Sequence, residues 1–406
     1  MNATSPPRLP VAVLVLALGT FLMGTTEFVV AGLLPELARD FTTTEAHAGL
    51  AITVFAFGMV LGPPVMPMLT LGMSRRGVLT LALAVYAGAH VVSALITGFA
   101  VLLATRFIAA VATGTFWAVA AVVAASLVGA ARASTAIGVV VGGGMLSTVI
   151  GVPLGAWAGQ ALGWRGPFWA LALGAAVAVV ALRRLVPEPT AGPEASGVRA
   201  ELASLRSGRL WIVLLICAAV NAGVLSVYSF VSPLLAGRAG AAASLVPVAL
   251  VLFGVGTFLG NLVGGRVGDQ RPLATIATTA TASLVACLVL VVAGAQIGPA
   301  LAAFALLGAF GLSANPVLLT LAVRYGGAGA TLPSAMATST FNAGTAVGTA
   351  LTATLLTGPL GDTSPAIVGL GFGLVVLAAL GALARATRPR PAPADVPVAV
   401  PATASC

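Results

Sequence analysis

The sequence predicts an all-α membrane protein that crosses the bilayer about twelve times, in two bundles of six helices. Of its 406 residues, 59% are hydrophobic and only 7% are charged. Soluble globular proteins carry about 25% charged residues, so this chain cannot cover its surface with charge and must face lipid. Its apolar residues also gather in runs long enough to cross a bilayer, and the longest polar break between runs falls near the middle of the chain.

Twelve apolar runs are expected to form the spans. The first, from Val11 to Leu34, is too long for the apolar core of a signal peptide and lacks a small-x-small cleavage site, so we expect it to be retained. The spans are placed at residues 11–34, 46–70, 78–97, 99–127, 135–159, 167–182, 210–235, 244–265, 273–294, 297–322, 333–357 and 363–384.

The arginines fix the expected orientation. The formal net charge of +9 would suit a nucleic-acid partner, but the arginines concentrate on alternate connecting segments. If the N-terminus lies inside, the outer segments carry only Arg39, Arg165 and Arg238. This positive-inside pattern predicts that both termini are cytoplasmic, and it argues against nucleic-acid binding. The composition, rich in Ala, Val, Gly and Leu, indicates a GC-rich bacterial genome and hence a multi-pass protein of the bacterial inner membrane.

The polar break defines the expected domains. Residues 186–208 are rich in Pro and Gly and are predicted to form a cytoplasmic linker. They separate an N-terminal six-helix bundle, 1–185, from a C-terminal one, 209–385, and the Pro/Ala-rich tail, 386–406, is predicted to be disordered. The pair Phe57-Gly58 recurs as Phe253-Gly254 at the same offset that relates Arg75 to Arg271, which favours two halves repeated in parallel.

Glu27 is the acidic residue that lies deepest within an apolar run. An ionised carboxylate at that depth costs several kcal/mol (about 2.5–3.5 kcal/mol on insertion scales), so an acid in a span is a functional candidate by default.

Three motifs resemble those of a known family. Gly24-Thr-Thr-Glu-Phe28, Arg106-Phe107 with Gly114, and Gly151-Val-Pro-Leu-Gly155 are similar to motifs in spans 1, 4 and 5 of the drug:proton antiporter branch of the major facilitator superfamily. The resemblance covers nearly the whole chain, and the forms of the span 1 and span 5 motifs are most similar to those of actinobacterial chloramphenicol exporters. It implies a major facilitator fold and export driven by the proton gradient.

The loops after spans 2 and 8 match the family's cytoplasmic loop motif unequally. The first keeps the basic pair Arg75 and Arg76 but lacks the expected aspartate, whereas the second has both Asp269 and Arg271. The resemblance therefore implies a complete conformational latch only in the second loop.

Glycines recur every four residues on spans 2, 5, 8 and 11, which the resemblance places at the interface between the halves. Residues four apart share a helix face, and small residues allow close helix approach. We therefore expect these faces to let the halves rock against each other, with ordinary packing between helices as the alternative. The predicted interface residues are Pro153 of span 5 and the glycines Gly58, Gly62, Gly143, Gly151, Gly155, Gly159, Gly256, Gly260, Gly264, Gly344 and Gly348.

Glu27 and Arg106 are expected at the same depth. Each lies about seven residues from the outer end of its span, which is roughly 10 Å at 1.5 Å per residue. Burial favours a neutral carboxyl group and a guanidinium favours a charged one, so the pair is predicted to couple proton movement to transport. The alternatives are that Glu27 is a static polar anchor bonded to Thr25 or a neighbouring helix, and that Arg106 braces backbone carbonyls.

The substrate cavity is expected to be largely apolar with a few polar groups. Lone amides in spans also hold helices together, which is the alternative for each asparagine. His47 and His90 are not expected at the site, since His90 falls late in the peripheral third span. The predicted cavity residues are Thr20, Met23, Val30, Ala31, Asn221, Tyr228, Asn315 and Asn342.

The leading prediction is a proton-driven exporter of a small, largely apolar compound such as a chloramphenicol-type antibiotic. Export of a sugar or another metabolite is the near alternative. A membrane-embedded enzyme would need clustered catalytic groups, and a channel would need symmetric polar rings, neither of which the spans contain. No phosphate-binding loop, metal-ligand spacing or other cofactor motif is present, and a monomer is expected.

Overall fold

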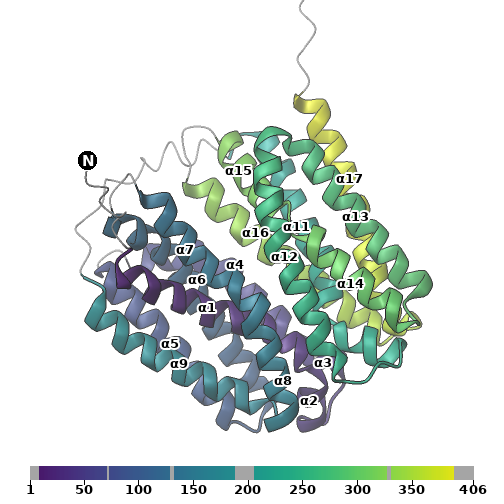
Figure 1. Ribbon diagram of the computed structural model, residues 1–406, viewed down its shortest axis with the longest axis horizontal. Coiled ribbons are helices and arrows are strands. Elements are labelled where there is room, and N and C mark those ends of the chain that lie inside the picture. The colour runs from purple at the N-terminus through teal and green to yellow at the C-terminus, as the bar shows by residue number, and fades with distance from the viewer. Residues whose placement is uncertain (1–8, 71–72, 129–131, 188–204, 327–330, 388–406) are drawn as a thin grey trace, which may run out of the picture.

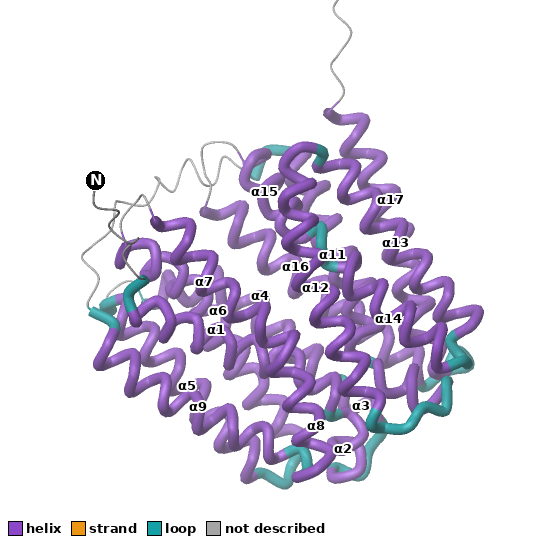
Figure 2. Tube along the Cα trace, viewed as in Figure 1, coloured by secondary structure: helices purple, strands orange, loops and turns teal. Residues whose placement is uncertain are grey.

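The computed structural model describes residues 9–70, 73–128, 132–187, 205–326 and 331–387, and every regular element in these ranges is a helix (Figure 2). Helices suit the composition because hydrocarbon offers no partner to an open backbone polar group. The predicted all-α fold class, with two bundles of membrane-spanning helices, is confirmed.

The first bundle contains the helices from α1 to α9 (Figure 1). Its first span is α1, continued by the short 3₁₀ helix η1, and the next helices form the connection to the second span. The bounds are α1 Val11–Val29, η1 Val30–Gly32, α2 Leu34–Asp40, α3 Glu45–Ala48, α4 Leu50–Leu69, α5 Arg75–Leu95, α6 Phe99–Val128, α7 Ala133–Leu146, η3 Ser147–Gly151, α8 Val152–Leu162 and α9 Arg165–Leu185.

The second bundle contains the helices from α11 to α17 (Figure 1). Its bounds are α11 Gly208–Ser229, η4 Pro233–Arg238, α12 Leu245–Gln270, α13 Pro272–Ala293, α14 Ile297–Gly311, α15 Asn315–Gly326, α16 Thr331–Leu356, η5 Gly361–Thr363 and α17 Ser364–Thr387.

Prolines explain the two broken spans. The fifth span is α7 and α8 joined by the π-helix η3, directly before Pro153. The tenth span breaks between α14 and α15, directly before Pro316. Proline lacks a backbone N–H and crowds the preceding turn, so the carbonyls before it must find other geometry, and a π-turn is one solution.

Among the described residues, eleven helical segments are long and apolar enough to cross a membrane. The predicted span at 333–357 corresponds to α16, which is not among the eleven but packs between α4 and α11 in the position of a span. Its threonines, serines and asparagine lower its hydropathy, and many of these side chains are satisfied by hydrogen bonds to their own helix. The polar side chains therefore lower the mean hydropathy of α16 below the value expected of a membrane span, although the helix is packed like one.

The two bundles meet mainly at one end of the molecule, which we call the closed end. It holds α2, α3 and α8 and lies opposite the start of α1 and the end of α17 (Figure 1). Here Thr53 Oγ1 lies 2.8 Å from Thr349 Oγ1, and Gln160 Nε2 donates to Ala243 O at 3.0 Å. Buried side chains of the first bundle at this end, such as Leu33, also belong to a hydrophobic core continuous with the second bundle.

The glycine faces do not lie where we expected. Spans 2 and 11 do pack across the halves, as do spans 5 and 8, but their glycines face helices of their own bundle. A Cβ at Gly58 would meet Ala110, and one at Gly344 would meet the backbone of Ala218. The same holds for every other glycine of the set, Gly62, Gly143, Gly151, Gly155, Gly159, Gly256, Gly260, Gly264 and Gly348.

The correction has a simple physical reason. A span at the interface has a second face that must pack inside its own bundle, and the close approach of helices there requires the small residues. Ordinary packing within a bundle, the alternative given above, therefore describes these glycines. Pro153 is also buried within the first bundle, at the start of α8.

The loop and linker predictions fall partly outside the described residues. Arg75 begins α5, and Arg76 Nη1 donates to Val186 O at 3.5 Å. Arg271 separates α12 from α13, while the side chain of Asp269 is not described. Residues 188–204 of the linker and 388–406 of the tail are likewise outside the described ranges.

Candidate transport cavity

A small cavity lies between the two bundles and is lined from both. From the first bundle α1, η1 and α4 contribute, and from the second α11 and α16. Its free volume, about 10 Å³, is close to what a single water molecule needs. The lining residues are Glu27, Phe28, Ala31, Ile52, Phe55, Ala56, Leu225, Tyr228, Ser229, Asn342 and Thr345. Pockets that bind drug-sized ligands measure about 300–1,000 Å³, so the cavity must widen to hold one.

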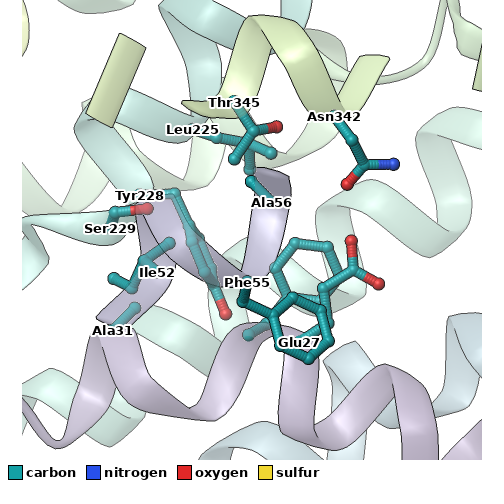
Figure 3. Close-up of a pocket in the computed structure, with 11 residues that line it drawn as sticks. Glu27, Ala31, Ile52, Phe55, Ala56, Leu225, Tyr228, Ser229, Asn342 and Thr345 are labelled. Carbon is teal, nitrogen blue, oxygen red and sulfur yellow. The ribbon is translucent and has the colours of Figure 1, made fainter. Parts of the chain in front are cut away.

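Glu27 is the acidic residue of this lining. It lies on α1, and in Figure 3 its carboxylate points toward the side of the cavity that holds the amide of Asn342. Among the residues that the structure describes, its carboxylate has no hydrogen-bond partner and no cation within 4.0 Å. Thr25, the anchor considered above, instead donates to Phe21 O at 2.8 Å in its own helix. The carboxylate is thus free to meet a proton or a ligand.

Arg106 lies behind the cavity wall. It is 1% exposed, and its Cζ sits 4.1 Å from the ring centroid of Phe55, which itself lines the cavity. Its Nε donates to Ala51 O at 3.3 Å and its Nη1 to Thr26 O at 3.0 Å. Arg106 therefore does brace backbone carbonyls of α1 and α4. It lies beyond ion-pair distance of Glu27 but within reach of its electrostatic field.

The remaining predicted cavity residues divide into two groups. Ala31, Tyr228 and Asn342 line the cavity with Glu27. The others pack between helices: Thr20 donates to Val140 O at 2.6 Å, Met23 and Val30 are fully buried, and Asn221 Nδ2 lies 3.5 Å from Asn315 Oδ1. The two asparagines therefore connect α11 to the start of α15, which is the helix-joining alternative.

Aromatic side chains form much of the wall that sequence reasoning missed. Phe28 meets Tyr228 edge-on across the two bundles, with centroids 5.7 Å apart and planes at 88°. Leu225 precedes the predicted cavity residue Tyr228 by three positions on α11, so the two share a helix face, and this spacing is the sequence signal that would have identified Leu225. Phe55 likewise follows Ile52 by three positions on α4, but neither of these two was predicted.

The comparisons agree with the fold and the motifs. The Major Facilitator Superfamily model matches residues 16–331. The chain is 36% identical over 376 residues to a chloramphenicol resistance protein of Streptomyces lividans, covering 92% of this chain and 95% of that protein. It is 30% identical over 357 residues to the inner membrane transport protein YdhP of Escherichia coli (strain K12), covering 88% and 91%.

Solved structures show the same architecture. A bacterial homolog of the human lysosomal transporter Spinster, in an inward-facing and occupied conformation, aligns with a TM-score of 0.71 at 17% identity, over 94% of this chain and 98% of that one. Members of this family are transporters rather than enzymes, and the helices make this a multi-pass bacterial membrane protein. The family match, the relatives and the helical architecture agree: the chain belongs to the major facilitator superfamily.

Proposed function

We propose that this transporter exports a small, largely apolar compound of the chloramphenicol type in exchange for protons. The observation that carries the proposal is that Glu27, which has no hydrogen-bond or ion-pair partner within the described part of the chain, lines a cavity whose other walls are mainly apolar and aromatic. The similarity to a chloramphenicol resistance protein supports the substrate class. Export of a sugar or another metabolite is less well supported, because Asn342, Thr345, Ser229 and Tyr228 are the few hydrogen-bonding groups beside the acid.

In the proposed cycle Glu27 takes up a proton when the cavity faces outside and releases it when the cavity faces the cytoplasm. Drug and proton compete for the same space, so loading one displaces the other. One proton that moves down a one-unit pH gradient supplies about 1.4 kcal/mol, which sustains about a tenfold concentration ratio of a neutral drug. No nucleotide or other cofactor is required, and one chain suffices because it contains both bundles.

The test compares parent, Glu27→Gln and Glu36→Gln in cells and in proteoliposomes. Glutamine keeps the size of the side chain but cannot carry a proton, so Glu27→Gln should lose chloramphenicol resistance and concentrative transport. Glu36 lies on α2, outside the cavity lining, so Glu36→Gln should keep both and controls for the loss of an acid. Concentrative, pH-dependent export by Glu27→Gln would refute the coupling role, and failure of the parent to move chloramphenicol would refute the substrate class.

A further inference from the structure

His90 lies in the core of the first bundle rather than at its periphery. It lies on α5 and is 1% exposed, and its side chain contacts Thr26 of α1 and Phe168 of α9. Its ring centroid lies 4.1 Å from that of Tyr86 and 5.5 Å from that of Phe168. Its Nε2 is 2.7 Å from Thr26 Oγ1, and its Nδ1 is 2.8 Å from Tyr86 O. Both ring nitrogens are therefore engaged, one of them with the residue that precedes Glu27.

The chemistry of the partners fixes the direction of each hydrogen bond. A backbone carbonyl only accepts, so His90 Nδ1 must carry a proton and donate it to Tyr86 O. A guanidinium only donates, so Thr26 Oγ1 accepts from Arg106 Nη1, at 2.9 Å. The hydroxyl proton of Thr26 is then directed to His90 Nε2, which must present its lone pair. The result is a continuous chain from Arg106 through Thr26 and a neutral His90 to Tyr86 O.

A protonated imidazole does not fit this chain. A proton on Nε2 would reverse this hydrogen bond, so the oxygen of Thr26 would have to accept from both His90 and Arg106 and the threonine proton would have to turn to another acceptor. It would also add a second positive charge next to the guanidinium. The titratable groups that face His90 are Tyr86 on its own helix and Arg106 on α6, with Glu27 one residue beyond Thr26 on α1. From α9 it meets the apolar ring of Phe168.

This hydrogen-bond chain determines the orientation of the Arg106 guanidinium. Three of its contacts are to Thr26 O, Thr26 Oγ1 and Ala51 O, and the ring of Phe55 covers one face of the guanidinium. Its Nη2 is buried and has no hydrogen-bond partner among the residues that the structure describes. A buried donor left open costs about 1–3 kcal/mol, so the other contacts must hold the guanidinium in place. The hydroxyl of Thr26 presents a lone pair to Nη1 in a fixed direction while its own proton is held by His90 Nε2.

We propose that His90 is a positioning residue for the coupling site: as a neutral acceptor it orients the Thr26 hydroxyl, which in turn holds the Arg106 guanidinium in place behind the cavity wall. His90 neither carries the transported proton nor contacts the drug. The consequence for transport rests on the function proposed above, whereas the hydrogen-bond chain itself does not.

The hydrogen-bond chain is tested first by ¹⁵N NMR of histidine-labelled protein in nanodiscs, purified without a histidine tag. The sequence contains two histidines, so a His47→Ala background leaves His90 alone. We expect a neutral ring protonated at Nδ1, unchanged from pH 5 to 8, with the Nε2 resonance shifted by Thr26→Val. An Nε2–H tautomer, or titration to imidazolium in this range, would overturn the proposal whether or not the parent transports chloramphenicol.

Transport tests the consequence. His90→Phe fills the space among the neighbouring rings but cannot accept, whereas His90→Gln places a carbonyl oxygen near the position of Nε2. With chloramphenicol at saturating concentration in proteoliposomes, His90→Phe and Thr26→Val should lower the proton-driven rate about five- to tenfold and change its pH profile. His90→Gln should restore both. If His90→Phe folds normally and matches the parent in rate and pH profile, His90 is packing alone and the proposal fails.

Discussion

Gly344→Ala tests whether the glycines of α16 serve packing inside the second bundle or movement between the bundles. A Cβ at this position would lie 2.7 Å from both the carbonyl carbon and the Cα of Ala218 on α11. Carbon atoms in contact prefer about 3.5–4.0 Å, so the two helices must separate by roughly 1 Å. Both obstacles are backbone atoms that no rotamer change can move, and overpacking of this kind costs about 1–3 kcal/mol.

The matched control is Gly381→Ala on α17, where a Cβ meets nothing within 4 Å. There alanine should be neutral or stabilising by up to about 1 kcal/mol, because glycine is the poorer helix former. In chains of 150–250 residues 1 kcal/mol moves the melting temperature by about 2–4 °C, so Gly344→Ala should melt several degrees below the control in the same nanodiscs. Equal melting temperatures combined with a slower transport rate would refute the assignment and restore the view that this face slides between the halves.

Three further predictions concern the closed end. Thr349→Val removes the hydrogen bond to Thr53 between the bundles; a loss of about 1 kcal/mol should populate the opened end about fivefold more, seen as longer distances between spin labels on α4 and α16. Asp40→Asn weakens the 2.8 Å ion pair with half-exposed Arg165 and should cost at most about 1 kcal/mol, a difference in melting temperature that 1 M salt removes. Burial raises the pKa of Glu36 above its ordinary value of 4.5, so the ionised form destabilises the fold as pH rises past that value. Glu36→Gln should therefore melt higher than the parent near pH 7.5 and equally near pH 4, and an unchanged difference between those pH values would contradict this sign.

Features of single helices could be predicted from local patterns in the sequence. Apolar runs located the spans to within a few residues, and the prolines at 153 and 316 coincide with the two broken spans. Glu27 stood out because a carboxylate in an apolar run is costly wherever the helix lies. These inferences need only the chain's own neighbours in sequence.

Predictions about contacts between helices were harder. Periodicity shows which residues share one face of a helix, but it does not show which neighbouring helix packs against that face. Thr20 and Ala31 were both predicted to line the cavity, yet Thr20 bonds to α7 and only Ala31 lines it. The same ambiguity misplaced the glycine faces. His90 was set aside because its helix looked peripheral, although even a peripheral helix turns one face inward, and that face meets Thr26.

The difference between contacts within and between the bundles indicates how the molecule can move. Inside the second bundle, backbone lies against backbone at Gly344 and Gly348, so its helices have no room to slide. Between the bundles, backbone meets backbone where a Cβ at Gly254 of α12 would reach Thr148 of η3, whereas the closed end is joined by side-chain hydrogen bonds such as Gln160 to Ala243 O, each worth about 0.5–1.5 kcal/mol net. A lipid-embedded interface also lacks the full hydrophobic driving force that water would supply. The bundles can therefore separate at the closed end as rigid bodies at modest cost, and that separation would carry Glu27 and Tyr228, on opposite walls of the cavity, away from each other.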